Sequence, residues 1–157
     1  MADIIIYTDG AAKGNPGNGG YGIVIMSGKH RKEVSVGYRL TTNNRMELLA
    51  VIVALEMIKQ PGNNVMIYSD SKYVIDSVEK KWVFAWKKKG FKGKKNVDLW
   101  QRFLKIYPAQ NVKFTWVKGH AGNVLNERVD QLAVGGAESD NLLVDEQYEA
   151  LNKTPLF

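Results

Sequence analysis

The stretch Ile4-Ile5-Ile6-Tyr7-Thr8-Asp9-Gly10 decides how the rest of the chain is read. Its apolar, β-branched and aromatic residues predict a buried strand over 4–8, and the run then ends on one carboxylate, Asp9. The same order returns at Val65-Met66-Ile67-Tyr68-Ser69-Asp70-Ser71. If the two strands are parallel neighbours, both carboxylates leave the same edge of the sheet, where open α/β sheets bind ligands. Two close carboxylates repel each other unless a cation or a proton lies between them, so the pattern predicts a metal site.

A structural role for these aspartates is the alternative. Aspartate after a strand is common as a turn residue or a helix N-cap. Asp70, at the head of an expected helix, fits a capping role as well as it fits a metal site. Two such aspartates together with further acids favour the metal site.

The chain has the size and composition of one folded domain. Its 157 residues are 45% hydrophobic and 24% charged, which is typical of a globular protein. There is no cysteine, so disulfides and thiolate metal sites are excluded. No signal peptide or membrane span is visible, and we expect a monomer in the cytoplasm without membrane contact. We expect a domain over 1–140 and a polar, loosely ordered tail over 141–157.

Charge is distributed unevenly around a net value of +6. Residues 80–95 contain eight lysines and no acid, whereas residues 119–157 contain seven acids against two basic residues. Like charges so close together are costly without a partner, and this asymmetry indicates a polyanionic ligand at one part of the surface.

Periodicity predicts alternating strands and helices. Strands are expected at 4–8, 21–26, 31–38, 65–69 and 112–117, and the first three form an antiparallel meander. Helices are expected from the capping run 41–44 to residue 60, and at 71–80, 81–88, 97–106 and 126–137. Loops are expected at 10–20 and 118–122. The first helix is apolar nearly all round, so it is buried, and Glu47 is expected in its first turn. Asp130 lies on the last of these helices.

The expected strands and helices thus allow four acidic residues to meet at one site: Asp9, Asp70, Glu47 and Asp130. Hard oxygen ligands suit Mg²⁺, with Mn²⁺ as the alternative ion. Two such ions about 4 Å apart can assist an in-line displacement at phosphorus.

Several longer motifs make the chain resemble the bacterial type 1 ribonuclease H family. They run in order from residue 4 to residue 137: Tyr7-Thr8-Asp9-Gly10, Gly14-Asn15-Pro16-Gly17, Thr41-Thr42-Asn43-Asn44-Arg45-Met46-Glu47, Ser69-Asp70-Ser71, Asn96-Val97-Asp98-Leu99-Trp100, Trp116-Val117-Lys118-Gly119-His120-Ala121-Gly122 and Asn126-Glu127-Arg128-Val129-Asp130.

The resemblance implies an α/β ribonuclease H-like fold, with a five-stranded mixed sheet of order 3-2-1-4-5 and helices on both faces. It implies an endonuclease that cleaves the RNA strand of an RNA–DNA hybrid by two-metal-ion catalysis and leaves 5′-phosphate and 3′-hydroxyl ends. The family's metal-binding carboxylates fall on Asp9, Glu47, Asp70 and Asp130, and its catalytic histidine falls on His120. With a usual pKa near 6.5, that histidine can relay a proton or assist product release.

Substrate contacts of the family fall on a further set of residues. Beside the carboxylates these are Asn15, Thr42, Asn43 and Asn44, whose alternative role is turn formation and helix capping. In the lysine-rich segment, which matches the family's basic protrusion, they are Trp82, Lys87 and Lys88. Packing within the protrusion is the alternative for Trp82 and for the neighbouring Phe84, and it is favoured for at least one of them. Lys72 stands where the family often has a glutamine that contacts the minor groove, so this contact is expected to differ.

Two other classes of protein compete with this interpretation. Integrases, transposases and junction resolvases share the fold and act on DNA, but the Thr-Thr-Asn-Asn run and the basic protrusion argue against them. A non-catalytic module that only binds hybrids is the second, and intact acids at all four positions argue against it.

Overall fold

A computed structural model describes residues 2–118 and 123–151 of the chain. It contains β1 (Ile4–Lys13), β2 (Gly17–Ser27), β3 (His30–Thr41), α1 (Asn43–Glu56), β4 (Asn64–Ser69), α2 (Lys72–Glu79), α3 (Trp82–Lys88), α4 (Val97–Ile106), a short 3₁₀ turn (Tyr107–Ala109), β5 (Asn111–Trp116), α5 (Val124–Ala137) and α6 (Glu146–Leu151).

The strands form one mixed sheet in the order β3-β2-β1-β4-β5, which confirms the predicted order. β1, β2 and β3 form the antiparallel meander, whereas β4 lies parallel to both β1 and β5. A parallel neighbour for β1 is possible because α1 carries the chain back across the sheet before β4 begins.

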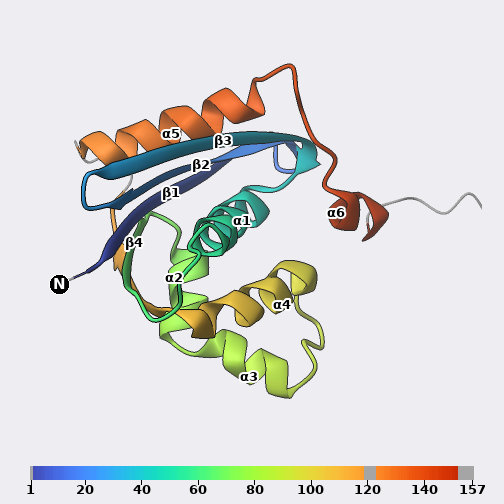
Figure 1. Ribbon diagram of the computed structural model, residues 1–157. Coiled ribbons are helices and arrows are strands. Elements are labelled where there is room, and N and C mark those ends of the chain that lie inside the picture. The colour runs from blue at the N-terminus through green and yellow to red at the C-terminus, as the bar shows by residue number, and fades with distance from the viewer. Residues whose placement is uncertain (1, 119–122, 152–157) are drawn as a thin grey trace, which may run out of the picture.

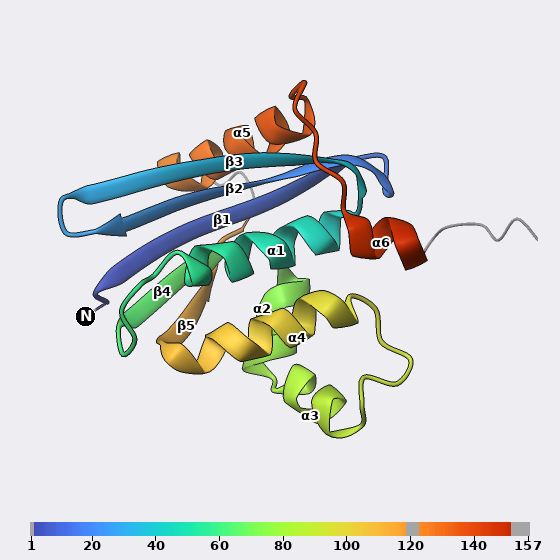
Figure 2. The same cartoon turned by 45° about the vertical axis from the view of Figure 1, so that its right-hand side comes forward.

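Helices cover both faces of this sheet, as expected (Figures 1 and 2). α5 lies along one face, and α1 lies against the other with α2, α3 and α4 beyond it. Among the described residues, no helix is long and apolar enough to cross a membrane.

α1 is the centre of the main core. Ten of its residues are buried, and the eight apolar ones pack with apolar side chains of the sheet and with Trp100 and Phe103 of α4. This confirms the prediction of a helix buried on most sides. The helix ends at Glu56 and not at residue 60, because the last turn tightens: the Ile58 N–H donates to the carbonyl of Leu55, three residues back.

The first strand differs most from its prediction. β1 does not end at residue 8 but continues to Lys13, so the expected loop over 10–20 is mostly strand. The glycines and alanines of this stretch pair with β2, from Gly10 opposite Tyr21 to Lys13 opposite Asn18. Small residues occur there because helices pack closely on the strand.

The segment after α5 is held more firmly than the expected loosely ordered tail. Leu143 exchanges backbone hydrogen bonds with β3, accepting from Arg39 at 2.9 Å and donating to Gly37 at 2.8 Å. The carboxylate of Glu149 accepts two hydrogen bonds from the Arg39 guanidinium. Asp145 is buried. Leu143, Asp145 and Glu149 thus attach the segment after α5 to the rest of the domain.

Candidate active site

The parallel pairing of β1 with β4 brings the two aspartates together. The last paired residues are Tyr7 and Tyr68, whose rings stack with centroids 4.5 Å apart. Asp9 and Asp70 each follow two residues later. Asp70 lies beyond the end of β4, as predicted, but Asp9 lies inside β1 opposite Gly22 of β2. The two aspartates therefore lie side by side where β4 ends, whereas β1 continues beyond this point.

Glu47 reaches this place because Gly10 has no side chain. A Cβ at Gly10 would overlap the backbone nitrogen of Glu47 and lie 2.6 Å from the carbonyl carbon of Met46. The start of α1 can thus press against β1 beside Asp9. Glu47 is the fifth residue of the helix and not part of its first turn, so the helix dipole does not explain its position.

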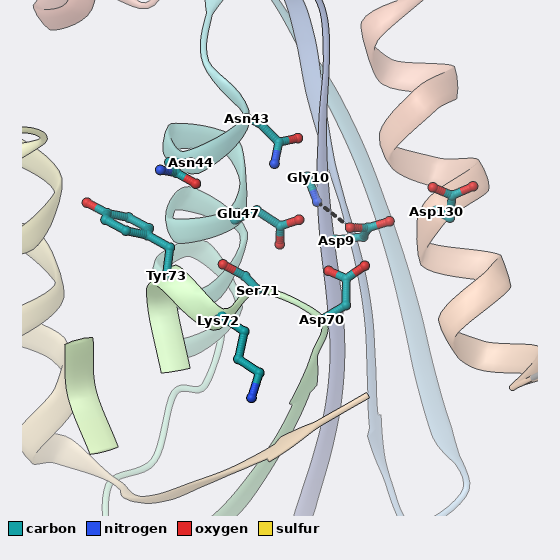
Figure 3. Close-up of a pocket in the computed structure, with 10 residues that line it drawn as sticks. All are labelled: Asp9, Gly10, Asn43, Asn44, Glu47, Asp70, Ser71, Lys72, Tyr73 and Asp130. Carbon is teal, nitrogen blue, oxygen red and sulfur yellow. Dashed lines mark hydrogen bonds between the residues drawn. The ribbon is translucent and has the colours of Figure 1, made fainter. Parts of the chain in front are cut away.

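Asp130 is brought to the site by another close approach. α5 crosses β2 where a Cβ at Gly22 would meet the Val129 carbonyl oxygen at 2.5 Å. Gly22 is the residue opposite Asp9, so α5 places Asp130 on the other side of Asp9 from Glu47 (Figure 3).

Three carboxylates converge closely. Asp9, Glu47 and Asp70 each offer one oxygen, and these oxygens all lie within 4.8 Å of one another. Asp130 lines the same cavity of about 360 Å³ without belonging to this close group. The full lining is Asp9, Gly10, Asn43, Asn44, Glu47, Asp70, Ser71, Lys72, Tyr73 and Asp130.

The electrostatics of the group favour a cation. Burial, followed by repulsion from Asp70, raises the pKa of Asp9 to about 7. Burial, followed by repulsion from Asp9 and Asp70, also holds the pKa of Glu47 well above its ordinary value. The buried Oε2 of Glu47 has no hydrogen-bond partner among the described residues. Among residues 2–118 and 123–151, no lysine or arginine forms an ion pair with any of these carboxylates.

The capping alternative for Asp70 does not apply. Ser71 is the N-cap of α2, and its hydroxyl accepts a hydrogen bond from the Val74 N–H at 3.2 Å. The Asp70 carboxylate is thus available to the cavity.

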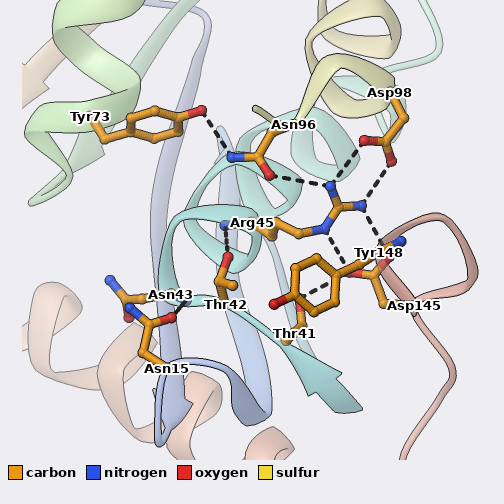
Figure 4. Close-up of polar contacts among 10 residues, drawn as sticks. All are labelled: Asn15, Thr41, Thr42, Asn43, Arg45, Tyr73, Asn96, Asp98, Asp145 and Tyr148. Carbon is orange, nitrogen blue, oxygen red and sulfur yellow. Dashed lines mark hydrogen bonds and ion pairs between the residues drawn. The ribbon is translucent and has the colours of Figure 1, made fainter. Parts of the chain in front are cut away.

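The polar residues beside the carboxylates have structural partners as well. Thr42 caps α1 by accepting from the Arg45 N–H at 3.2 Å, and Asn15 accepts from the Asn43 N–H at 3.1 Å (Figure 4). Asn15, Thr42 and Asn44 also line a groove of about 770 Å³ that runs to Lys94, Lys95 and α6. Asn44 lines both this groove and the carboxylate cavity, so the two hollows adjoin at that residue.

Sequence reasoning missed the role of Arg45, which is 2% exposed. Its guanidinium donates two hydrogen bonds to Asp98 of α4 and two to Asp145, and one more to Asn96 at 3.3 Å (Figure 4). Arg45 therefore ties the start of α1 to α4 and to the C-terminal segment. The motif 41–47 contains Arg45, but no local signal identifies its partners.

The lysine-rich segment forms α3 and the following turn, and all eight of its lysines are exposed. Phe84 packs against Tyr107 and Trp86 against Trp100, so these aromatics are structural. Trp82 is 45% exposed, with the Lys80 ammonium 5.2 Å from its ring centroid. The packing alternative thus holds for Phe84, although its partner Tyr107 lies outside the protrusion, whereas Trp82 keeps nearly half of its surface exposed.

His120 lies outside the described residues. Lys72 lies at the rim of the carboxylate cavity, and Lys87 and Lys88 lie on α3.

Comparison with known proteins agrees with this arrangement. Residues 1–138 match the family model for RNase H. The chain is 53% identical over 150 residues to "Ribonuclease H" of Desulforamulus reducens, covering 92% of this chain and 94% of that one. Among solved structures, LC9-RNase H1, described as a type 1 RNase H with the type 2 active-site motif, has a TM-score of 0.75 and 31% identity, covering 98% of this chain and 82% of that one. LC11-RNase H1 in complex with RNA/DNA hybrid has a TM-score of 0.56 and 27% identity, covering 85% of this chain and 96% of that one. The chain therefore belongs to the RNase H family of hydrolytic endonucleases.

Proposed function

We propose that this protein hydrolyses the RNA strand of RNA–DNA hybrids with two divalent cations and leaves 5′-phosphate and 3′-hydroxyl ends. The observation that carries the proposal is the convergence of Asp9, Glu47 and Asp70, whose oxygens lie within 4.8 Å of one another in a member of this family. The relative LC11-RNase H1, solved with an RNA/DNA hybrid, supports the hybrid as substrate.

The residues present fit a divalent cation. All donors are hard carboxylate oxygens, which suits Mg²⁺, with Mn²⁺ as the alternative. The orphaned Glu47 Oε2 and the raised pKa values of Asp9 and Glu47 are the features that a cation would satisfy. When bound, such ions neutralise charge on the phosphate and lower the pKa of water.

The four carboxylates divide into a central pair and two flanking residues. Asp9 and Asp70 lie in the middle, and the Gly10 N–H fixes one Asp9 oxygen by a 2.9 Å hydrogen bond. Glu47 from α1 and Asp130 from α5 lie on opposite sides of Asp9 (Figure 3). In our proposal Asp9 and Asp70 would hold both ions, Glu47 would help to hold the one that assists the leaving group, and Asp130 would help to hold the one that activates water.

The remaining residues position the substrate. We assign RNA-strand contacts to Asn15, Thr42, Asn43 and Asn44, because short amides and hydroxyls beside the carboxylates can bind sugar hydroxyls and phosphates. The exposed Trp82, Lys87 and Lys88 would bind the DNA strand, with lysines on phosphates and the aromatic ring on a deoxyribose. His120 is proposed to relay a proton.

An end-labelled hybrid tests the proposal. Cleavage is expected in Mg²⁺ and absent in EDTA, with 3′-hydroxyl ends on the released fragments. Asp70→Asn keeps the shape of the side chain but removes its charge, so it should nearly abolish cleavage and leave hybrid binding largely intact. Retention of even a tenth of the wild-type turnover would contradict the assignment.

The same assay separates the competing classes. Preferential cleavage of DNA duplex would indicate the DNA-acting enzymes of this fold, and binding without cleavage would indicate a non-catalytic module. The proposed monomer and its cytoplasmic location are checked by sedimentation and by fractionation of cells.

A further inference from the structure

Lys72 lies beside the carboxylates without pairing with them. It is the first residue of α2, two positions after Asp70, and it lines the carboxylate cavity. Figure 3 shows its side chain leading away from the acids. Within residues 2–118 and 123–151, Lys72 forms no ion pair with a carboxylate. Its ammonium is thus not used to neutralise the metal-binding group.

The ammonium is held by an aromatic ring instead. It lies 4.2 Å from the centroid of Trp116, the last residue of β5. Trp116 is fixed in turn, because its indole N–H donates to the Asp70 backbone carbonyl at 3.2 Å and its backbone pairs with Ser69. A ring that is 44% exposed contributes little to the core, so its position is better explained by what it holds.

This arrangement gives the cavity a second polar border. Asn43 and Asn44 border the carboxylates on one side in Figure 3, and Lys72 borders them on the opposite side. A nucleic-acid strand that crosses the cavity along this line, with its scissile phosphate at the carboxylates, would meet Lys72 on one side and the two asparagines on the other. A lysine is a point charge that suits phosphate, whereas an amide at this position would suit a base edge. Contact with the ring restricts the ammonium before the ligand arrives.

We propose that Lys72, positioned by Trp116, binds a backbone phosphate of the cleaved strand on the side of the carboxylates opposite Asn43 and Asn44. This inference rests on the proposed function, since it takes the strand to be the RNA of a hybrid. Trp116 acts through Lys72 and is a positioning residue.

The salt dependence of hybrid binding tests the contact. Affinity is measured by fluorescence anisotropy in EDTA, where cleavage does not occur, between about 50 and about 200 mM salt. Lys72→Gln should weaken binding and reduce the slope of log affinity against log salt by about 1, because one phosphate contact is lost. Lys72→Arg should keep the slope. Lys59→Gln, an exposed lysine after α1, is the matched control for loss of one charge and should keep the wild-type slope.

Two further variants test the role of the ring. Trp116→Leu should weaken hybrid binding. The double variant Trp116→Leu with Lys72→Gln should bind the hybrid no more weakly than the worse of the two single variants, because both changes remove the same phosphate contact. Circular dichroism of each variant verifies the fold. An unchanged slope in Lys72→Gln, an equal change in Lys59→Gln, or additive effects of Lys72 and Trp116 would overturn the inference.

Failure of the proposed function would be distinguishable from failure of this inference. Wild-type protein that does not cleave the hybrid in Mg²⁺ refutes the proposed function. Wild-type protein that cleaves it, with an unchanged slope in Lys72→Gln, refutes only the phosphate contact.

Discussion

Arg45 donates two hydrogen bonds to Asp145, a residue 100 positions further along the chain, from Nε at 2.8 Å and from Nη2 at 3.0 Å. The Thr41 hydroxyl donates to the same carboxylate at 2.9 Å. Although burial acts in the opposite direction, the hydrogen bonds from Arg45 to Asp98 and Asp145 raise the pKa of Arg45 above its ordinary value. A guanidinium that loses Asp145 keeps Asp98 as its counter-charge, but it loses two charge-assisted hydrogen bonds in a buried place.

Asp145→Asn should therefore destabilise the protein by about 1.5 to 3 kcal/mol, the range for hydrogen bonds to a charged group. Chemical denaturation at neutral pH measures the change. Asp140→Asn is the control, because Asp140 is exposed and should matter little. Equal stability of the two variants would show that the C-terminal segment does not support the start of α1.

Gly10→Ala should destabilise the protein by about 1 to 3 kcal/mol, the usual range for overpacking, and lower kcat as well. The added methyl group would push α1 away from β1 and separate Glu47 from Asp9. Gly135→Ala is the matched control, because this exposed helical glycine has open space around it, and alanine there should stabilise by about 0.5 to 1 kcal/mol. A Gly10→Ala enzyme with full activity would contradict the close approach as the reason for a glycine.

The surroundings of Asp9 and of Arg45 show which features of the structure can be predicted from the sequence and which cannot. The apolar runs that end in Asp9 and Asp70, with a helix between them, allow parallel neighbours and predict that the two carboxylates converge, because that information is local. The full strand order was implied only by the family resemblance. The path of β1 beyond Asp9 was not predictable in this way, since glycine and alanine there are typical of a loop and become strand only under packed helices. The contact of Arg45 with Asp145 has no local signature in the sequence. The polar C-terminal segment is therefore predicted to be loosely ordered when only its own residues are considered.

Without metal, Asp9→Asn should stabilise the protein at neutral pH. The pKa of Asp9 is raised from 3.8 to about 7, so the folded state binds its proton more tightly than the unfolded state does. The contribution of this protonation to the free energy of unfolding is fully present below about pH 4, and it is lost as the pH rises to about 7. In EDTA, the wild-type free energy of unfolding should fall over this range, and Asp9→Asn should remove much of the fall, with a gain of at least about 1 kcal/mol at pH 7.5.

Mg²⁺ should reverse the order of the two proteins. A ligand that binds the folded state stabilises it, and the wild-type site binds the ion better than the variant does. Thermal melts with and without Mg²⁺ measure both effects. An Asp9→Asn protein that melts below wild type in EDTA would count against mutual repulsion of the carboxylates.

Replacement of Lys87, Lys88 and Lys89 by alanine should raise KM and flatten its dependence on salt, with kcat little changed. Contacts far from the reaction bind ground state and transition state alike. Each lost phosphate contact removes about 0.7 to 0.9 from the salt slope. Alanine at the exposed Lys29, Lys59 and Lys105 removes the same charge elsewhere and serves as the control. The same salt slope in both triple variants would mean that α3 does not face the nucleic acid.

Recognition of the hybrid should require a run of ribonucleotides in one strand and DNA in the other. Asn15, Asn43 and Asn44 lie next to the carboxylates and are suited to the 2′-hydroxyl groups that distinguish RNA from DNA. α3 lies on the far side of α4 from α1 (Figure 2), and its exposed lysines are suited to the opposite strand. DNA duplex should therefore not be cleaved, because it lacks the 2′-hydroxyl groups that the asparagines bind. RNA duplex should not be cleaved, because its second strand does not fit the lysines of α3.

A series of DNA duplexes measures this requirement, with one ribonucleotide and then progressively longer runs placed in one strand. Cleavage should appear only as the run lengthens, because several asparagine contacts must be filled together, and the product should carry a 3′-hydroxyl. DNA duplex and RNA duplex of the same sequence are the controls. Efficient cutting at an isolated ribonucleotide would show that the asparagines do not read consecutive 2′-hydroxyl groups. A 2′,3′-cyclic phosphate product would show that the 2′-hydroxyl itself attacks the phosphorus, which is incompatible with hydrolysis at the carboxylates.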